Sequence, residues 1–164
     1  LTRTSYKKFH LKSGAPFYSQ YNIGSYTFSR YKVVWKRMTT DIVATVISEM
    51  KTPFGYKATI SLDTTVIFPV ENEPEAHYLC AIINSKPVRD FIKSFSSAGR
   101  GFGTPSVMEH VGIPKFDPKN LLHQKFVETS KNCHQLKLEG KENEIEKLEK
   151  ENDGLVGKLF NITK

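Results

Sequence analysis

The sequence predicts an α+β fold: a mixed, mostly antiparallel sheet, two short helices and a C-terminal helical hairpin of the coiled-coil type. Two observations predict this class. Alternating and β-branched residues fill much of 16–70, which is typical of strands, whereas apolar residues recur at helical spacing from Glu73 onward. We expect one domain over residues 1–120, whose sheet is formed by 16–70 and 112–117, and a helical spacer over 121–164.

The strand signals come first along the chain. Side chains alternate between apolar and polar from Tyr31 to Met38, and residues 41–48 are rich in Val, Ile and Thr. Residues 52–55 read Thr-Pro-Phe-Gly, which is a turn signal, and the apolar, Thr-rich run 58–70 predicts one or two further strands. A last strand is expected at 112–117, at the edge of the sheet because it contains a proline.

Helical signals follow. Glu73-Pro74-Glu75 places acids and a proline where a helix N-terminus favours them, and a second amphipathic pattern covers 88–95. From Leu121 apolar residues step by three and four, with Gly140 as a break, and Asn152 in the second seam suits a register-setting role. We expect a hairpin that packs on itself or on a partner helix, so self-association through 121–164 is a predicted contact.

The charge is unevenly distributed. The chain of 164 residues carries a net charge of +7, and its first sixty residues hold ten cations and two acids. A polyanion is the natural partner of such a one-sided field, and the basic part has the pattern of strands rather than of a membrane-surface helix. No apolar run is long enough for a membrane span, and the two isolated cysteines favour the reducing cytoplasm. Because the first residue is Leu1, we expect a domain cut from a longer protein.

Aromatic and basic residues are interleaved between Pro16 and Met38, where seven rings alternate with four cations. Rings that stack on bases and cations that meet phosphates suit a nucleic-acid surface; the alternative is a core strand whose lysines reach out to solvent. The Gly-rich loop 99–103 could place an arginine against DNA, although a simple tight loop is the alternative. Our candidates for phosphate contacts are Lys32, Lys36, Arg37, Lys51 and Lys57, and those for base contacts are Tyr18, Tyr21, Asn22, Arg30 and Arg100.

Catalytic signatures are absent from the sequence. The Gly-rich loop lacks the Gly-Lys-Ser/Thr of a phosphate-binding loop, and neither a nucleophile elbow nor a zinc-protease motif occurs. We therefore predict no catalytic residue, no metal site and no cofactor in this chain. One enzymatic alternative is a cryptic metal-dependent nuclease that uses Asp63 or Glu139, and another class is a protein-interaction module acting through the heptad hairpin.

Five segments in order resemble a known family. They are Tyr21–Trp35, Glu75–Ser85, Gly101–Pro105, Ile113–Asp117 and the tail Leu148–Thr163, which is similar to an Ile-Asp-x-Leu-Val-x-x-Leu-Tyr-x-Leu-Thr ending. The set resembles the TaqI-like C-terminal specificity domain of restriction–modification enzymes, which is the target-recognition domain fused to N6-adenine methyltransferases and type IIG restriction enzymes.

The resemblance implies a domain that recognises a sequence in double-stranded DNA without being catalytic itself. It implies an upstream methyltransferase domain in the same polypeptide, which binds S-adenosylmethionine and methylates an adenine, and in type IIG enzymes a fused endonuclease.

Overall fold

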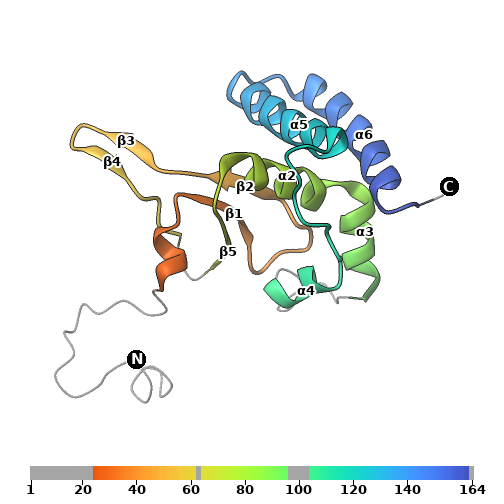
Figure 1. Cartoon of the computed structure of the whole chain (residues 1–164), viewed down its shortest axis with the longest axis horizontal. Coiled ribbons are helices and arrows are strands. Elements are labelled where there is room, and N and C mark those ends of the chain that lie inside the picture. Colours follow the sequence, from red (N-terminus) through yellow and green to blue (C-terminus); the bar gives the residue numbers. More distant parts are fainter. Residues whose placement is uncertain (1–23, 62–63, 96–103, 163–164) are drawn as a thin grey trace, which may run out of the picture.

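The computed structural model describes residues 24–61, 64–95 and 104–162. These residues form an α+β fold in which a small antiparallel sheet and a set of helices pack together (Figure 1). In chain order the elements are the 3-10 helix η1 (Ser25–Phe28), the strands β1 (Tyr31–Lys36), β2 (Ala44–Ile47), β3 (Met50–Thr52), β4 (Gly55–Lys57) and β5 (Thr65–Val70), and the helices α2 (Glu73–Asn84), α3 (Lys86–Phe95), α4 (Pro105–Glu109), α5 (Leu121–Leu138) and α6 (Glu142–Leu159).

The main sheet has three strands in the order β2-β1-β5, and both pairings are antiparallel. The central strand β1 places Val33 opposite Val46 on one side and opposite Phe68 on the other. The predicted strands 31–38 and 41–48 correspond to β1 and β2, whereas the run 58–70 yields the single strand β5. β3 and β4 form a separate two-stranded ribbon.

The prediction of a strand at 112–117 is wrong, because this segment is a loop. Gly112 has a φ of +63°, in the left-handed region, and Pro114 has no N–H to donate to a neighbouring strand. The hydroxyl of Tyr78 donates to the carbonyl oxygen of Pro114 at 2.9 Å. The segment is therefore held against α2 by a side chain, and not by strand pairing.

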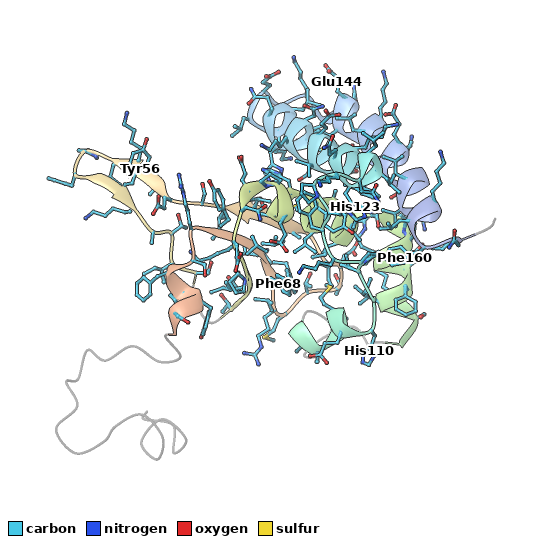
Figure 2. The ribbon with its side chains drawn as sticks, viewed as in Figure 1. Tyr56, Phe68, His110, His123, Glu144 and Phe160 are labelled. Carbon is cyan, nitrogen blue, oxygen red and sulfur yellow. The ribbon has the colours of Figure 1, made fainter. Side chains whose placement is uncertain are left out.

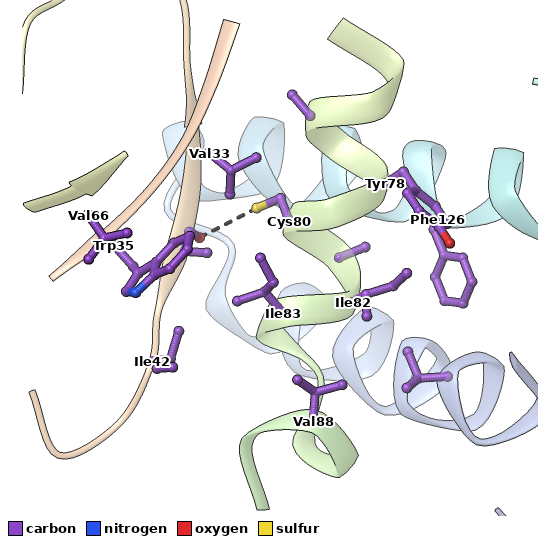
Figure 3. Packing of buried hydrophobic residues seen from close by; sticks show 14 of the residues in the cluster. Val33, Trp35, Ile42, Val66, Tyr78, Cys80, Ile82, Ile83, Val88 and Phe126 are labelled. Atoms are coloured by element: carbon purple, nitrogen blue, oxygen red, sulfur yellow. Dashed lines mark hydrogen bonds between the residues drawn. The ribbon is translucent and has the colours of Figure 1, made fainter. Parts of the chain in front are cut away.

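Helix α2 is the centre of the core, with the sheet on one side and α5 on the other (Figure 3). Trp35, Ile42 and Val66 face it from the sheet side, and Phe126 packs against Tyr78 on the far side. Asn84 binds both backbone groups of Ala44, accepting from its N–H at 2.7 Å and donating to its carbonyl oxygen at 2.8 Å. These two bonds attach the end of α2 to the edge strand β2.

The predicted helical hairpin is present, with its break at Gly140, whose φ is +72°. Both of its helices contribute to the same hydrophobic core as the sheet and α2, because Phe126 of α5 and Val156 of α6 are fully buried in that core. The Asn152 amide of α6 also donates to the carbonyl oxygen of Ala81 in α2 at 2.8 Å. Central residues of the heptad seams are thus buried within the chain. Self-association through 121–164 remains a prediction that this arrangement does not test.

In the part of the chain that the structure describes, no helix combines the length and the apolar character needed to cross a membrane. Cys80 is buried and Cys133 is half-buried, and both are free thiols. Burial raises the pKa of Cys80 to about 12. This thiol therefore remains protonated at neutral pH and fills space in the core.

Candidate nucleic-acid interface

The β3–β4 ribbon extends away from the helical layer at one end of the molecule (Figure 1). Three residue pairs form it: Met50 opposite Lys57, Lys51 opposite Tyr56, and Thr52 opposite Gly55. The short connection at its tip is the Thr-Pro-Phe-Gly turn that the sequence predicted. The strands on either side of this turn have only three residues each, too few to give a recognisable alternation.

The ribbon presents large and basic side chains to solvent on both faces. Directly opposed residues of an antiparallel pair point to the same face, so Lys51 lies beside Tyr56 and Lys57 lies beside Met50 on the other face. Both lysines are exposed, and Tyr56 is 69% exposed (Figure 2). Within the described residues neither lysine has an ion-pair partner. Their charges are thus available to an external anion.

The prediction that Lys32 contacts a phosphate is wrong. Its side chain is 0% exposed, and its ammonium donates to the carbonyl oxygen of Thr59 at 3.0 Å. The prediction assumed that one face of β1 meets solvent, whereas residues 32 to 35 are buried on both faces. Burial lowers the pKa of Lys32, with Glu49 opposing the shift, so the charged form is disfavoured at this position.

Lys32 instead holds the base of the ribbon. The hydroxyl of Thr59, just after β4, donates to the carbonyl oxygen of Ser48, just before β3, at 2.6 Å. The Lys32 ammonium is bound to the carbonyl of the same Thr59. This chain of contacts joins both ends of the ribbon to β1, and it fixes the direction in which the ribbon leaves the sheet.

Arg30 lies beside the ribbon, immediately before β1. Its guanidinium is 3.7 Å from the Glu49 carboxylate and its central carbon lies 5.3 Å from the centre of the Tyr31 ring. Both contacts are solvent-exposed and therefore weak. Arg30 is the predicted base-contacting residue that the structure places near the ribbon, and a phosphate could displace Glu49 from it.

Lys36 and Arg37 are exposed at the opposite end of β1. The ribbon follows β2, whose last residue Ile47 pairs with Lys32 at the start of β1. Four residues of strand, roughly 13 Å, therefore separate the ribbon end of the sheet from the Lys36 end. The structure does not bring the predicted phosphate contacts into one cluster: Lys51 and Lys57 form one group and the end of β1 forms another.

Four predicted base-contacting residues lie outside the described residues. They are Tyr18, Tyr21, Asn22 and Arg100.

A buried polar cluster between α2, α5 and β2 was missed by sequence reasoning. Nδ1 of His77 lies 2.9 Å from the hydroxyl of Ser130, and its Nε2 lies 4.0 Å from the Glu73 carboxylate. His134 accepts from the Val46 N–H at 3.2 Å through Nε2, and its Nδ1 lies 2.7 Å from the Ser130 carbonyl oxygen. Only the spacing of these histidines on apolar helix faces could have signalled the cluster.

This cluster does not form a hydrolytic site, although it joins a serine, a histidine and a carboxylate. Ser130 is 4% exposed in the middle of α5, so no substrate reaches its hydroxyl. Burial lowers the pKa of His77 to about 4, with His134 and Lys131 adding to the shift and Glu73 opposing it. The neutral imidazole serves to satisfy buried polar groups and to hold α5 against α2.

A shallow cavity of about 840 Å³ lies between α3 and α6. Its lining mixes Lys86, Lys150 and Lys158 with Asp90 and Asp153. Because two aspartates offset two of the three lysines, the lining has less excess positive charge than the ribbon, whose two lysines have no acid beside them in residues 50–60.

Of the two carboxylates considered as alternatives for a metal-dependent nuclease, the structure describes only Glu139. Glu139 is exposed at the end of α5, with its carboxylate 2.7 Å from the Lys141 ammonium, whereas Asp63 lies outside the described residues. No group of three or more potential metal ligands occurs among the residues that are described.

Comparison with known proteins gives no match to a family model, to a curated protein or to a solved structure. The resemblance to the TaqI-like specificity domain therefore rests on the five sequence segments alone.

Proposed function

We propose that this chain is a sequence-specific recognition domain for double-stranded DNA, non-catalytic in itself, within a restriction–modification N6-adenine methyltransferase. The observation that carries the proposal is the exposed β3–β4 ribbon, with Lys51 and Tyr56 on one face and Met50 and Lys57 on the other.

The size and chemistry of the ribbon fit the major groove of B-DNA. Two paired strands about 5 Å apart, with their side chains, fit a groove about 12 Å wide. One face of an inserted ribbon meets base edges while lysines reach the phosphates on the groove walls. Each face of this ribbon offers one lysine and one large side chain, so either face can supply both kinds of contact.

The proposal for the parent protein rests on the resemblance. An upstream domain in the same cytoplasmic polypeptide would bind S-adenosylmethionine and transfer its methyl group to an adenine. This chain would choose the site at which that transfer takes place.

The two alternatives have less support from the described contacts. A protein-interaction function through the heptad seams has to compete with their use inside the chain, where Phe126 and Asn152 are buried. For a nuclease function, the described part of the chain offers no group of three or more potential metal ligands, and the Glu139 carboxylate is paired with the Lys141 ammonium.

Binding of a 30-base-pair random duplex to the whole chain, measured over a range of salt concentrations, tests the proposal. Four of the five predicted phosphate contacts remain exposed, Lys36, Arg37, Lys51 and Lys57, and if all bind, log affinity falls with log salt at a slope of about −3.6. If only the two ribbon lysines bind, the slope is about −1.8. No measurable binding, or a slope near zero, contradicts the proposal.

A further inference from the structure

The tip of the ribbon exposes an aromatic ring. Phe54 is 88% exposed, more than any other large apolar side chain among the described residues. Met50 and Tyr56 are also exposed on the same short ribbon. A single exposed apolar residue needs no explanation, but three on one narrow projection indicate a binding element.

The turn holds this ring in a defined position. The hydroxyl of Thr52 donates to the Gly55 carbonyl oxygen at 2.7 Å and accepts from the Phe54 N–H at 3.2 Å. Pro53 has a fixed φ, and Gly55 adopts a φ of +98° that other residues rarely accept. Phe54 is therefore presented to its partner by a backbone that is already ordered, which lowers the cost of binding.

The charges around the ring select the partner. Residues 50–60 contain Lys51 and Lys57 and no acid. Both lysines lie behind the tip, one on each strand: Lys51 is one residue pair and Lys57 two residue pairs behind the Thr52–Gly55 pair, roughly 3 and 7 Å along the ribbon. A ring at the front with cations set back on both sides matches a base stack flanked by two phosphate backbones. A flat apolar protein surface would not use the lysines, and a flat bilayer would not need so narrow a tip.

We propose that the Pro53–Phe54 tip is a wedge that enters between two base pairs of the bound duplex, unstacks them and kinks the DNA. Apolar side chains of this kind act as wedges in DNA-bending proteins of the minor groove. Here the ring would enter from the major groove, in which the ribbon is proposed to lie, and base–ring stacking would offset part of the unstacking. Kinking would add recognition through DNA deformability, because flexible steps accept the wedge at lower cost than stiff ones. This inference rests on the proposed function, since it requires that the chain bind DNA.

Relaxation of a closed circular plasmid by a topoisomerase in the presence of the whole chain tests the wedge. An inserted ring untwists the step that it enters, so the relaxed plasmid is expected to have a linking number that falls as more protein is bound. Phe54→Ala should abolish this shift at equal occupancy of the DNA and weaken binding about fivefold or more. Phe54→Trp should retain the shift, because indole also stacks.

Leu138→Ala is the matched control, because Leu138 is 84% exposed but lies at the end of α5, far along the chain from the ribbon. Plasmid relaxed in the presence of Leu138→Ala should show the same fall in linking number as plasmid relaxed with the unaltered chain. An equal shift with Phe54→Ala, or salt-dependent binding of the unaltered chain with no shift at saturation, overturns the wedge and leaves DNA binding intact. Absence of plasmid binding overturns the proposed function and the wedge together. Phe54-dependent binding to phosphatidylserine vesicles, with no Phe54-dependent change in the plasmid, also overturns it.

Discussion

Removal of the two ribbon lysines should weaken DNA binding by a predictable amount. The variant Lys51→Ala/Lys57→Ala deletes two exposed cations without touching the core or the turn bonds of the ribbon. Each phosphate contact contributes about 0.9 to the slope of log affinity against log salt, so the slope should become less steep by about 1.8. If each contact contributes nothing at 1 M salt, the same relation means that each contact raises the affinity roughly fivefold at 0.15 M salt. The double variant should therefore bind about 30-fold more weakly, which corresponds to about 2 kcal/mol.

Fluorescence anisotropy of a labelled duplex between 50 and 300 mM salt measures both quantities. The control is Lys147→Ala/Lys150→Ala, which removes the same charge from exposed positions of α6. Only the ribbon pair should change the slope by about 1.8. Equal losses of affinity and slope in the two variants would mean that net charge, and not the ribbon, binds DNA, and the reasoning from the ribbon would be refuted.

Three further predictions concern the scaffold. Lys32→Met removes the ammonium that binds the Thr59 carbonyl, so hydrogen exchange of the ribbon amides should accelerate while the amides of α2 keep their rates; unchanged ribbon rates would show that Lys32 does not anchor it. Because burial lowers the pKa of His77 to about 4, the unfolded chain binds a proton at this residue more readily than the folded chain does. The free energy of unfolding should therefore fall by about 3 kcal/mol as the pH drops from 6.5 to 4. Urea unfolding should show this loss in the unaltered chain and a flatter profile in His77→Gln, and parallel profiles would contradict it. Phe126→Ala should cost about 3–5 kcal/mol in a single unfolding transition if the hairpin shares the core, whereas a separate transition of the hairpin would argue against one core.

The sequence predicted best those elements whose signal is local. The helical hairpin follows from the three-and-four spacing of apolar residues and from Gly140, and both features act within a few residues of chain. The start of α2 likewise follows from its Glu-Pro-Glu segment, with Asn72 accepting from the Glu75 N–H at 2.9 Å.

The errors came from tertiary contacts. Residues 112–117 have a strand-like composition, but the Tyr78 hydroxyl donates to the carbonyl oxygen of Pro114, and no strand of the described residues pairs with the segment. Lys32 belongs to an alternating strand, and nothing in that alternation reveals that the second face of β1 is also covered. The turn of the ribbon was predicted, whereas its role as an exposed surface was not, because exposure of Met50 and Tyr56 depends on where the rest of the chain packs.

Selection of the whole chain against a pool of random duplexes tests the central claim most directly. Sequence-specific recognition predicts that successive rounds enrich a common short motif, and that selection with Tyr56→Ala, which removes a 69% exposed ring from the ribbon, loses preference at one or more positions of it. A pool that stays random after selection, or a motif that the ribbon variant enriches unchanged, would contradict the account.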